Sequence, residues 1–206
     1  MPKKVLLFLA EGFEDLEAVS ILDVMGWTSY REHVPTVEVI TTGFRPIVHS
    51  RFGLHANVDI SFQDVDASDY AALAIPGGFH SHGFDEAYDE RLHDLARCIH
   101  TQGSWIATFC VGVLPVAEAG ILAGKRAVSY PFSRNHDNLG RLRELGVEVG
   151  DSEVVVDHRV ISCAGPASSL QVAYRLLEAV IGPERGAEVR RLMCEHWRRP
   201  EDLPGS

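Results

Sequence analysis

Short runs of apolar and β-branched residues alternate along the chain with longer segments whose apolar residues recur about every three to four positions. The short runs predict buried β-strands, and they lie at residues 5–10, 36–42, 71–75 and 105–109. The longer segments predict α-helices, and they lie at residues 14–30, 85–101, 113–119 and 168–181. Strands that alternate with helices are typical of a mostly parallel sheet with helices on both faces, so we predict an α/β fold.

Two further pairs of short β-prone runs predict β-hairpins. The pairs lie at residues 47–50 with 54–58 and at residues 154–156 with 160–162. The tail is predicted to be helical from Gly186 and to break at Pro200. Because no repeat, low-complexity tract or linker interrupts the pattern, we predict a single domain over residues 1–206.

Charge and cysteine usage narrow the function class. The chain carries a formal net charge of -10, which argues against a nucleic-acid binder because that function needs a basic face. Its four cysteines are scattered without a CxxC spacing, so we expect reduced intracellular thiols rather than a disulfide frame or a metal site. No apolar run approaches the roughly 20 residues that span a bilayer, and no secretory signal is visible. We therefore predict a cytoplasmic protein that binds neither nucleic acid nor membrane.

The segments that follow three of the predicted strands contain the candidate catalytic residues. In parallel sheets the working residues collect at the carboxyl ends of the strands, so residues 11–17, residues 76–83 and Cys110 are expected to meet. Cys110 lies between a strand and a helix, which is the pattern of a thiol nucleophile elbow. A helix N-terminus favours the thiolate and offers free N–H groups. The alternative is a buried structural cysteine, the usual fate of a free thiol.

Two more features follow the neighbouring strands. Gly77 and Gly78 let the backbone approach a ligand and turn N–H groups inward, as an oxyanion site requires, although they also fit an ordinary tight turn. Glu17 lies on the first turns of the opening helix. If it is buried beside a thiolate it keeps its proton and can act as a hydrogen-bond donor or an acid/base, whereas the alternative is a surface glutamate. Glu14 and Asp15 are expected to be solvated or to cap the helix.

Four histidines and a second cysteine are further candidates. His80 and His82 form a His-x-His pair that can bind metal or move protons, although loop histidines are commonly solvated. His93 and His100 are expected at the surface of a polar helix. Cys163 is either a resolving thiol or a core thiol. The tail is expected to cover the pocket or a dimer contact, or to be a solvated helix end, and its relevant residues are Arg190, Arg191, Trp197, Arg198 and Arg199.

Four segments in one order resemble the ThiJ/PfpI superfamily, the family of the parkinsonism-associated protein deglycase. These segments are residues 10–17, 75–78, 109–112 and 162–166, and the resemblance covers roughly residues 4–181. It implies a flavodoxin-like three-layer sandwich, of the type found in class I glutamine amidotransferases, and usually a homodimer. It places the nucleophile at Cys110, the acid at Glu17, the oxyanion donors at the N–H groups of Gly78 and Val111, and an arginine near the site at Arg51.

The chain departs from this family at the position of a histidine partner. The protease-like branch has a histidine directly after the cysteine, where this chain has Val111. The parkinsonism protein has a histidine just before a proline after the next strand, where this chain has Tyr130. Residues 110–115 are similar to those of uncharacterised bacterial members. Peptide hydrolysis by a Cys-His pair is therefore not expected.

The sequence leaves three functions open. The first is a glyoxalase-like or deglycase-like enzyme without a cofactor, in which Cys110 attacks a small reactive carbonyl and Glu17 moves the proton. The second is a redox-sensing stress-response protein in which Cys110 is oxidised, and the third is a non-catalytic ligand-binding scaffold. The predicted pocket also contains Gly77, Tyr130, His80, His82 and Arg51.

Overall fold

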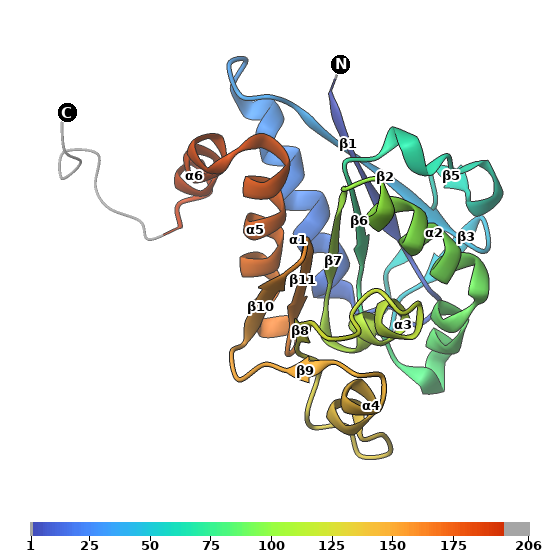
Figure 1. Ribbon diagram of the computed structural model, residues 1–206. Helices are drawn as coiled ribbons and strands as arrows, with labels where there is room; N and C mark the ends of the chain where they lie inside the picture. The colour runs from blue at the N-terminus through green and yellow to red at the C-terminus, as the bar shows by residue number, and fades with distance from the viewer. Residues whose placement is uncertain (1, 196–206) are drawn as a thin grey trace.

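A computed structural model describes residues 2–195, and a seven-stranded sheet forms the centre of the molecule (Figure 1). The order across the sheet is β10-β11-β7-β6-β1-β2-β5. Neighbouring strands run parallel except at one edge, where β10 pairs antiparallel with β11. The strands are β1 (Lys3–Phe8), β2 (Val37–Gly43), β5 (Ile60–Ser61), β6 (Ala72–Ile75), β7 (Trp105–Thr108), β10 (Val154–Asp157) and β11 (Val160–Cys163).

Helices cover both faces of this sheet (Figure 1). On one side lie α1 (Asp15–Gly26) and α5 (Ser169–Ile181), with α6 (Pro183–Leu192) packed against α5. On the other side lie α2 (Glu90–Thr101) and α3 (Val113–Glu118). The predicted sandwich of a mostly parallel sheet between two helical layers is therefore confirmed.

Two separate apolar cores fill the spaces between the layers, because successive side chains of a strand point to opposite faces. On β1, Leu6 and Phe8 belong to the core under α2 and α3, whereas Val5 and Leu7 belong to the core under α1 and α5. All four side chains are fully buried. A strand that is buried on both faces has a continuous apolar sequence, which is why the pattern of residues predicted it.

The end of α1 and the start of α2 differ from the prediction. The α-helical part of the first helix ends at Gly26 and is followed by a 3₁₀ turn, Trp27–Tyr30. The segment predicted as helical from residue 85 begins instead with a 3₁₀ turn, Phe84–Tyr88. The α-helix starts after it because the Asp89 side chain accepts a hydrogen bond from the Arg91 N–H, at 2.9 Å.

His93 is buried, so the surface position predicted for it is wrong. Its side chain lies on the inward stripe of α2 and the residue is 6% exposed. Its Nδ1 is 3.3 Å from Glu90 Oε2, while Nε2 is buried and has no hydrogen-bond partner within residues 2–195. His100 is partly buried, with Nε2 3.0 Å from the carbonyl oxygen of His158. The polar composition of α2 hid the apolar stripe that faces the sheet.

Two small sheets accompany the central one. The predicted first hairpin is present as β3 (Ile47–His49) and β4 (His55–Asn57). The second small sheet, which was not predicted, pairs β8 (Arg126–Ala127) with β9 (Glu148–Val149), and α4 (Asn138–Glu144) lies between them in sequence. This segment contacts α3 and the β10–β11 hairpin and lies at the carboxyl end of the parallel strands (Figure 1). It forms one wall of the site described below.

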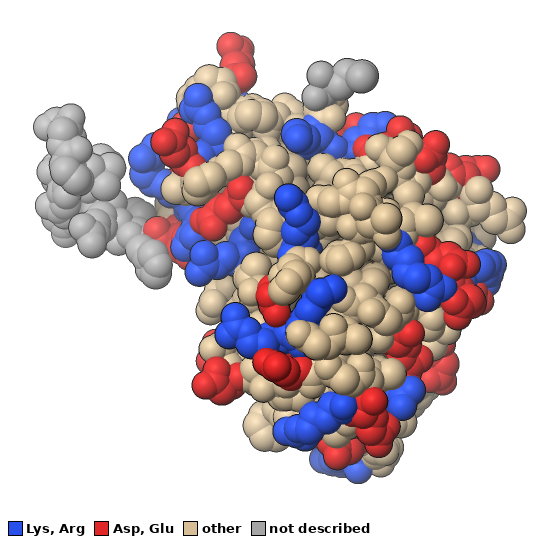
Figure 2. Space-filling view, in the orientation of Figure 1, with Lys and Arg blue, Asp and Glu red and all other residues tan. Residues whose placement is uncertain are grey.

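The surface mixes charges of both signs on the face that Figure 2 shows, where basic and acidic side chains are interspersed over the helices and loops. Between residues 2 and 195, no helix is long and apolar enough to cross a membrane. Trp197, Arg198, Arg199 and Pro200 of the predicted tail lie outside the described residues.

Candidate active site

Cys110 occupies a sharp turn directly after β7. It begins a 3₁₀ turn, Cys110–Gly112, and has a φ of 51°, a left-handed conformation that non-glycine residues rarely adopt. The Gly112 N–H donates to the Phe109 carbonyl at 2.7 Å, and the buried Ser129 hydroxyl donates to the Cys110 carbonyl at 3.0 Å. The surrounding backbone therefore holds the thiol in the geometry of a nucleophile elbow.

Gly112 is required by the close packing of this turn against the end of β6. A Cβ atom added at Gly112 would lie 2.5 Å from the carbonyl oxygen of Ile75 and 2.8 Å from that of Pro76. Both atoms belong to backbone that cannot move aside easily. The close packing of this turn therefore explains why a glycine stands two residues after Cys110.

Gly77 lies between Cys110 and Glu17. A Cβ atom added there would lie 2.9 Å from Cys110 Cβ and 3.0 Å from Glu17 Oε2. The Gly77 N–H donates to the same Glu17 oxygen at 2.7 Å. The sequence prediction that these three segments converge is met, and the glycine is what allows the thiol and the carboxyl group to approach.

Glu17 is fully buried, in contrast to the surface alternative. Burial raises the pKa of Glu17 well above its usual range, a charge on Glu14 raises it further, and the hydrogen bond from Gly77 lowers it. Its other oxygen, Oε1, is buried without a hydrogen-bond partner among the described residues. Glu17 therefore keeps its proton at neutral pH and has one oxygen from which to donate it.

Glu14 caps α1, as one of the two predicted alternatives stated. Its carboxylate accepts a hydrogen bond from the Glu17 N–H at 2.9 Å. It is not solvated, however, because only 7% of its surface is exposed. Asp15 is partly buried and accepts from the Ser50 hydroxyl at 2.6 Å, so it joins α1 to the β3–β4 hairpin.

The electrostatic environment of Cys110 differs from the one predicted. The residue begins a 3₁₀ turn rather than an α-helix, and burial raises the pKa of its thiol above the usual range. A charge on Glu17 would raise this pKa further, whereas a hydrogen bond from the Val111 N–H lowers it. Because Glu17 is protonated, that repulsion is absent. A protonated carboxyl group is also able to donate a hydrogen bond, although its Oε1 makes none to the described residues in this structure.

A cavity of about 530 Å³ opens above the thiol and is lined by Cys110, Gly78, Val111, Tyr130 and His80. The Phe13–Gly78 bridge is flanked by hydrogen bonds from Glu14 to Gly77 and from Phe79 to Gly12. The Gly78 N–H itself takes part in none of the hydrogen bonds formed by residues 2–195. Two residues of the cavity wall therefore offer N–H groups: that of Gly78 is free within the described residues, and that of Val111 is directed at the sulfur.

Three predicted pocket residues do not line this cavity. Gly77 lies behind Cys110, and the Arg51 guanidinium stacks over the rings of Phe52 and Phe79 at 5.2 and 5.5 Å. His82 points elsewhere, because its ring nitrogen Nδ1 is bound to the Ser81 hydroxyl at 2.8 Å. These three residues lie outside the cavity wall.

Sequence reasoning missed the aromatic and amide residues that form the rest of the wall. Phe52, Phe79 and Phe132 line the cavity, and Phe132 is 79% exposed. The loop before α4 adds His136, and the first residue of α4 adds Asn138. The polar run at residues 133–138, which follows Phe132, was the available signal for these last residues.

Cys163 is a core thiol rather than a partner that shares the cavity. It is fully buried in β11, and its thiol donates to the Gly165 carbonyl at 3.5 Å. Burial is the main cause that raises its pKa to about 12, and a charge on Glu17 would be the next. Of the tail arginines, Arg190 binds Glu178 at 2.6 Å and so lies against α5, toward the other end of the sheet (Figure 1). No group of three or more potential ligands within residues 2–195 is arranged to hold a metal ion.

Known proteins share both the sequence and the fold. The DJ-1/PfpI family pattern matches residues 3–179. A deglycase of Pyrococcus abyssi is 29% identical over 164 residues, which cover 79% of this chain and 90% of that protein. Protein DJ-1alpha of Drosophila melanogaster is 28% identical over 194 residues, which cover 93% of this chain and 83% of that protein.

Among solved structures, Drosophila melanogaster DJ-1beta superposes with a TM-score of 0.79 at 26% identity, over 94% of this chain and 98% of that one. An oxidized form of Toxoplasma gondii DJ-1 superposes with a TM-score of 0.78 at 26% identity, over 93% of this chain and 97% of that one. These likenesses confirm the predicted fold.

Proposed function

The chain belongs to the DJ-1/PfpI family, and on that premise we propose that it is an enzyme that uses Cys110 to transform small reactive carbonyls of the glyoxal type. The observation that carries the proposal is the strained, cavity-lining thiol next to a buried, protonated carboxyl group. The name of the Pyrococcus abyssi relative, a deglycase, supports the same class of chemistry.

The proposed reaction begins with a bond between the Cys110 sulfur and the aldehyde carbon. The thiol loses its proton, the carbonyl oxygen gains one, and the product is a hemithioacetal. A proton then moves from the former aldehyde carbon to the neighbouring carbonyl carbon, which gives the thioester of a 2-hydroxy acid without an external oxidant. Water releases the acid and restores the thiol.

The residues around Cys110 suit these steps. The protonated Glu17 can donate to the sulfur while it carries negative charge, and the N–H groups of Gly78 and Val111 can stabilise a developing oxyanion. Val111 stands where a protease-like branch has its histidine, so we do not propose peptide hydrolysis.

Consumption of methylglyoxal by purified protein tests the proposal. We expect Cys110→Ala to reduce it to the uncatalysed rate, because no other thiol among the described residues shares this cavity. Cys98→Ala is the matched control, since Cys98 is exposed and remote from the cavity. An unchanged rate in Cys110→Ala would end the proposal.

A redox-sensing role is the second candidate, and it is favoured by the hydrogen bond from Val111 to the Cys110 sulfur. Oxygens added to the sulfur would meet the same donors. The Toxoplasma gondii relative was solved in an oxidized form. Mild peroxide followed by peptide mass spectrometry should then modify Cys110 before Cys98 and Cys194, and the reverse order would exclude this role.

The predicted homodimer stays a prediction. The exposed stripe of Leu16, Val19 and Leu22 on α1 supports it, because these apolar side chains are 51%, 40% and 41% exposed. Sedimentation of the wild-type protein and of Leu16→Glu would test whether a second copy covers this stripe.

A further inference from the structure

The proposed proton shift needs a base that the residues next to the sulfur do not supply. Glu17 holds its proton, and the two positions where the family resemblance suggested a histidine carry Val111 and Tyr130. A phenol hydroxyl serves as a donor more readily than as a base. The base must therefore come from another element that faces the cavity.

His80 meets this requirement by its position and its orientation. It lines the same cavity as Cys110 and lies on the 3₁₀ turn His80–His82 that follows the Gly77-Gly78 pair. Its Nδ1 is 2.5 Å from Asp85 Oδ1. Because a carboxylate only accepts hydrogen bonds, Nδ1 carries the proton, and Nε2 is left with its lone pair.

The imidazole is also fixed in place by its neighbours. Its ring stacks on Tyr88 with centroids 5.7 Å apart and meets Phe84 edge-on at 5.8 Å. Within residues 2–195, Nε2 has no hydrogen-bond partner. A histidine held by a carboxylate on one nitrogen and open on the other has the arrangement of a general base and its orienting acid.

We propose that His80 is the general base of the Cys110 site and that Asp85 is the residue that positions it. This inference rests on the proposed carbonyl chemistry. His80 Nε2 removes the proton from the carbon bonded to sulfur, which leaves an enediolate. The protonated His80 returns that proton to the neighbouring carbon while the hydroxyl proton of the first carbon passes to the oxygen of the second, so that the thioester forms and His80 is neutral again. His80 then takes a proton from the water that cleaves the thioester, and passes it to the leaving sulfur, so that both return to their starting states.

Several elements contribute titratable and charged groups around His80. Asp85 touches it directly, and burial raises the pKa of Tyr88, so that phenol stays neutral. The His136 ring lies 4.5 Å away. The other titratable and charged groups on the inner side are Glu14, Cys110, Tyr130 and Arg134.

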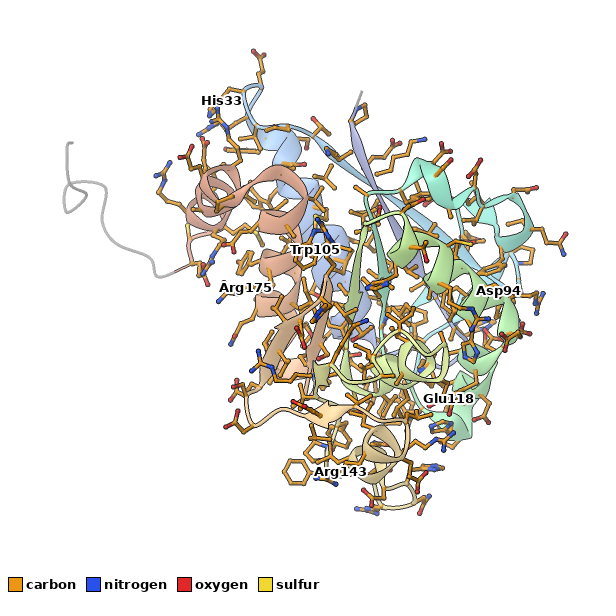
Figure 3. All side chains as sticks on the ribbon, viewed as in Figure 1. His33, Asp94, Trp105, Glu118, Arg143 and Arg175 are labelled. Atoms are coloured by element: carbon orange, nitrogen blue, oxygen red, sulfur yellow. The ribbon has the colours of Figure 1, made fainter. Side chains whose placement is uncertain are left out.

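On its other side His80 borders a second cavity of about 540 Å³. The charged residues there are Asp85, Glu118, Asp137, Arg141 and Glu144. Arg141 is already paired with Glu118 and Glu144, each at 3.1 Å. Figure 3 shows Glu118 at the end of α3, which marks the position of this second cavity. Acidic side chains therefore outnumber basic ones on this side of His80.

The neighbouring histidines provide the controls. His82 is in the same turn but outside the cavity, with Nδ1 bound to Ser81. His136 lines the cavity, yet it is exposed, and no hydrogen bond from the described residues orients its ring. His80 alone of the three combines access to the cavity with a carboxylate partner.

Steady-state kinetics with methylglyoxal tests the inference. We expect His80→Gln to lower kcat about 100-fold, the usual contribution of a general base, and Asp85→Asn to lower it about tenfold and to change the acidic limb of the pH profile. His82→Gln should stay within about twofold of the wild-type protein. Alkylation of Cys110 by iodoacetamide should be unchanged in His80→Gln, since in this proposal His80 does not remove the proton from the resting thiol.

The outcomes separate this inference from the proposed function. Wild-type turnover in His80→Gln, or a large loss only in His136→Gln, overturns the role of His80 while the role of Cys110 stands. Wild-type turnover in Cys110→Ala overturns the proposed function itself. If His80→Gln does not fold, ¹⁵N NMR of the wild-type histidines decides, because the inference requires His80 to carry its proton on Nδ1. The Nε2–H tautomer would overturn it.

Discussion

Cys110 and Cys163 follow or end adjacent parallel strands of one sheet, yet their surroundings are different. Cys163 sits in regular strand backbone and is fully buried. Its thiol donates to the Gly165 carbonyl, and backbone hydrogen bonds of Cys110 and Gly165 to its sulfur lower its pKa. Cys110 has a strained φ, an N–H group directed at its sulfur, a protonated carboxyl group next to it and a cavity above it. Burial raises the pKa of both thiols. Both sulfurs receive backbone hydrogen bonds, so what distinguishes Cys110 as the candidate nucleophile is its access to the cavity and its strained turn.

The largest difference between the two thiols should appear in alkylation. With iodoacetamide at neutral pH, we expect Cys110 to react about 100-fold faster than Cys163, because Cys110 lines a cavity that the reagent can enter whereas Cys163 is fully buried. Peptide mass spectrometry over time measures both rates in one sample. Equal rates would mean that the cavity gives Cys110 no advantage.

A glycine-to-alanine substitution should destabilise the protein more in the turn of Cys110 than beside Cys163. Gly112→Ala should destabilise the protein by about 2 kcal/mol, because its Cβ would lie 2.5 Å from the Ile75 carbonyl oxygen. Gly165→Ala, beside Cys163, should change the free energy of unfolding by less than about 0.5 kcal/mol, since its Cβ meets only Tyr130 Cδ2 at 3.4 Å. Urea unfolding compares the two variants, and similar losses would contradict the steric account.

The donor role of Glu17 can be separated from its volume by two substitutions. Glu17→Leu should slow alkylation of Cys110 about tenfold, because a hydrogen bond to a charged group is lost. Glu17→Gln, whose amide can still donate, should stay within about threefold of the wild-type rate. A Glu17→Leu protein that reacts as fast as the wild type would show that the carboxyl group does not assist the thiolate.

The smallest expected effect is on stability. Burial raises the pKa of Glu17 in the folded state, whereas the unfolded chain ionises it at ordinary values. The folded state therefore binds more protons, and stability falls as pH rises above the unfolded value. Glu17→Gln removes this cost, so we expect it to unfold with a free energy higher by on the order of 1 kcal/mol at pH 7. The gain should disappear near pH 4, and a gain independent of pH would contradict a protonated Glu17.

The sequence predicted the parts of the site that depend on local pattern. The buried strands have continuous apolar sequences, and the parallel arrangement brings Glu17, Gly77 and Cys110 to one edge. It could not separate His80 from His82, because one 3₁₀ turn directs them to different partners. It also missed α4, whose seven residues are too few for a helical period to be visible.

Local sequence pattern also could not predict that His93 is buried or that Phe132 lines the cavity. His93 is hidden in a helix that is polar overall, and Phe132 lies in a loop whose place depends on packing against the rest of the fold. Tertiary contacts, rather than composition, decide both positions.

Acid-quenched mass spectrometry of the protein during turnover of methylglyoxal tests the central claim most directly. A hemithioacetal and its thioester both add the full mass of the carbonyl compound to the nucleophile, and acid preserves the thioester. The account predicts this added mass on the peptide that contains Cys110 and not on the one that contains Cys163. Turnover without any adduct on Cys110, or with an adduct on Cys163 instead, would contradict it.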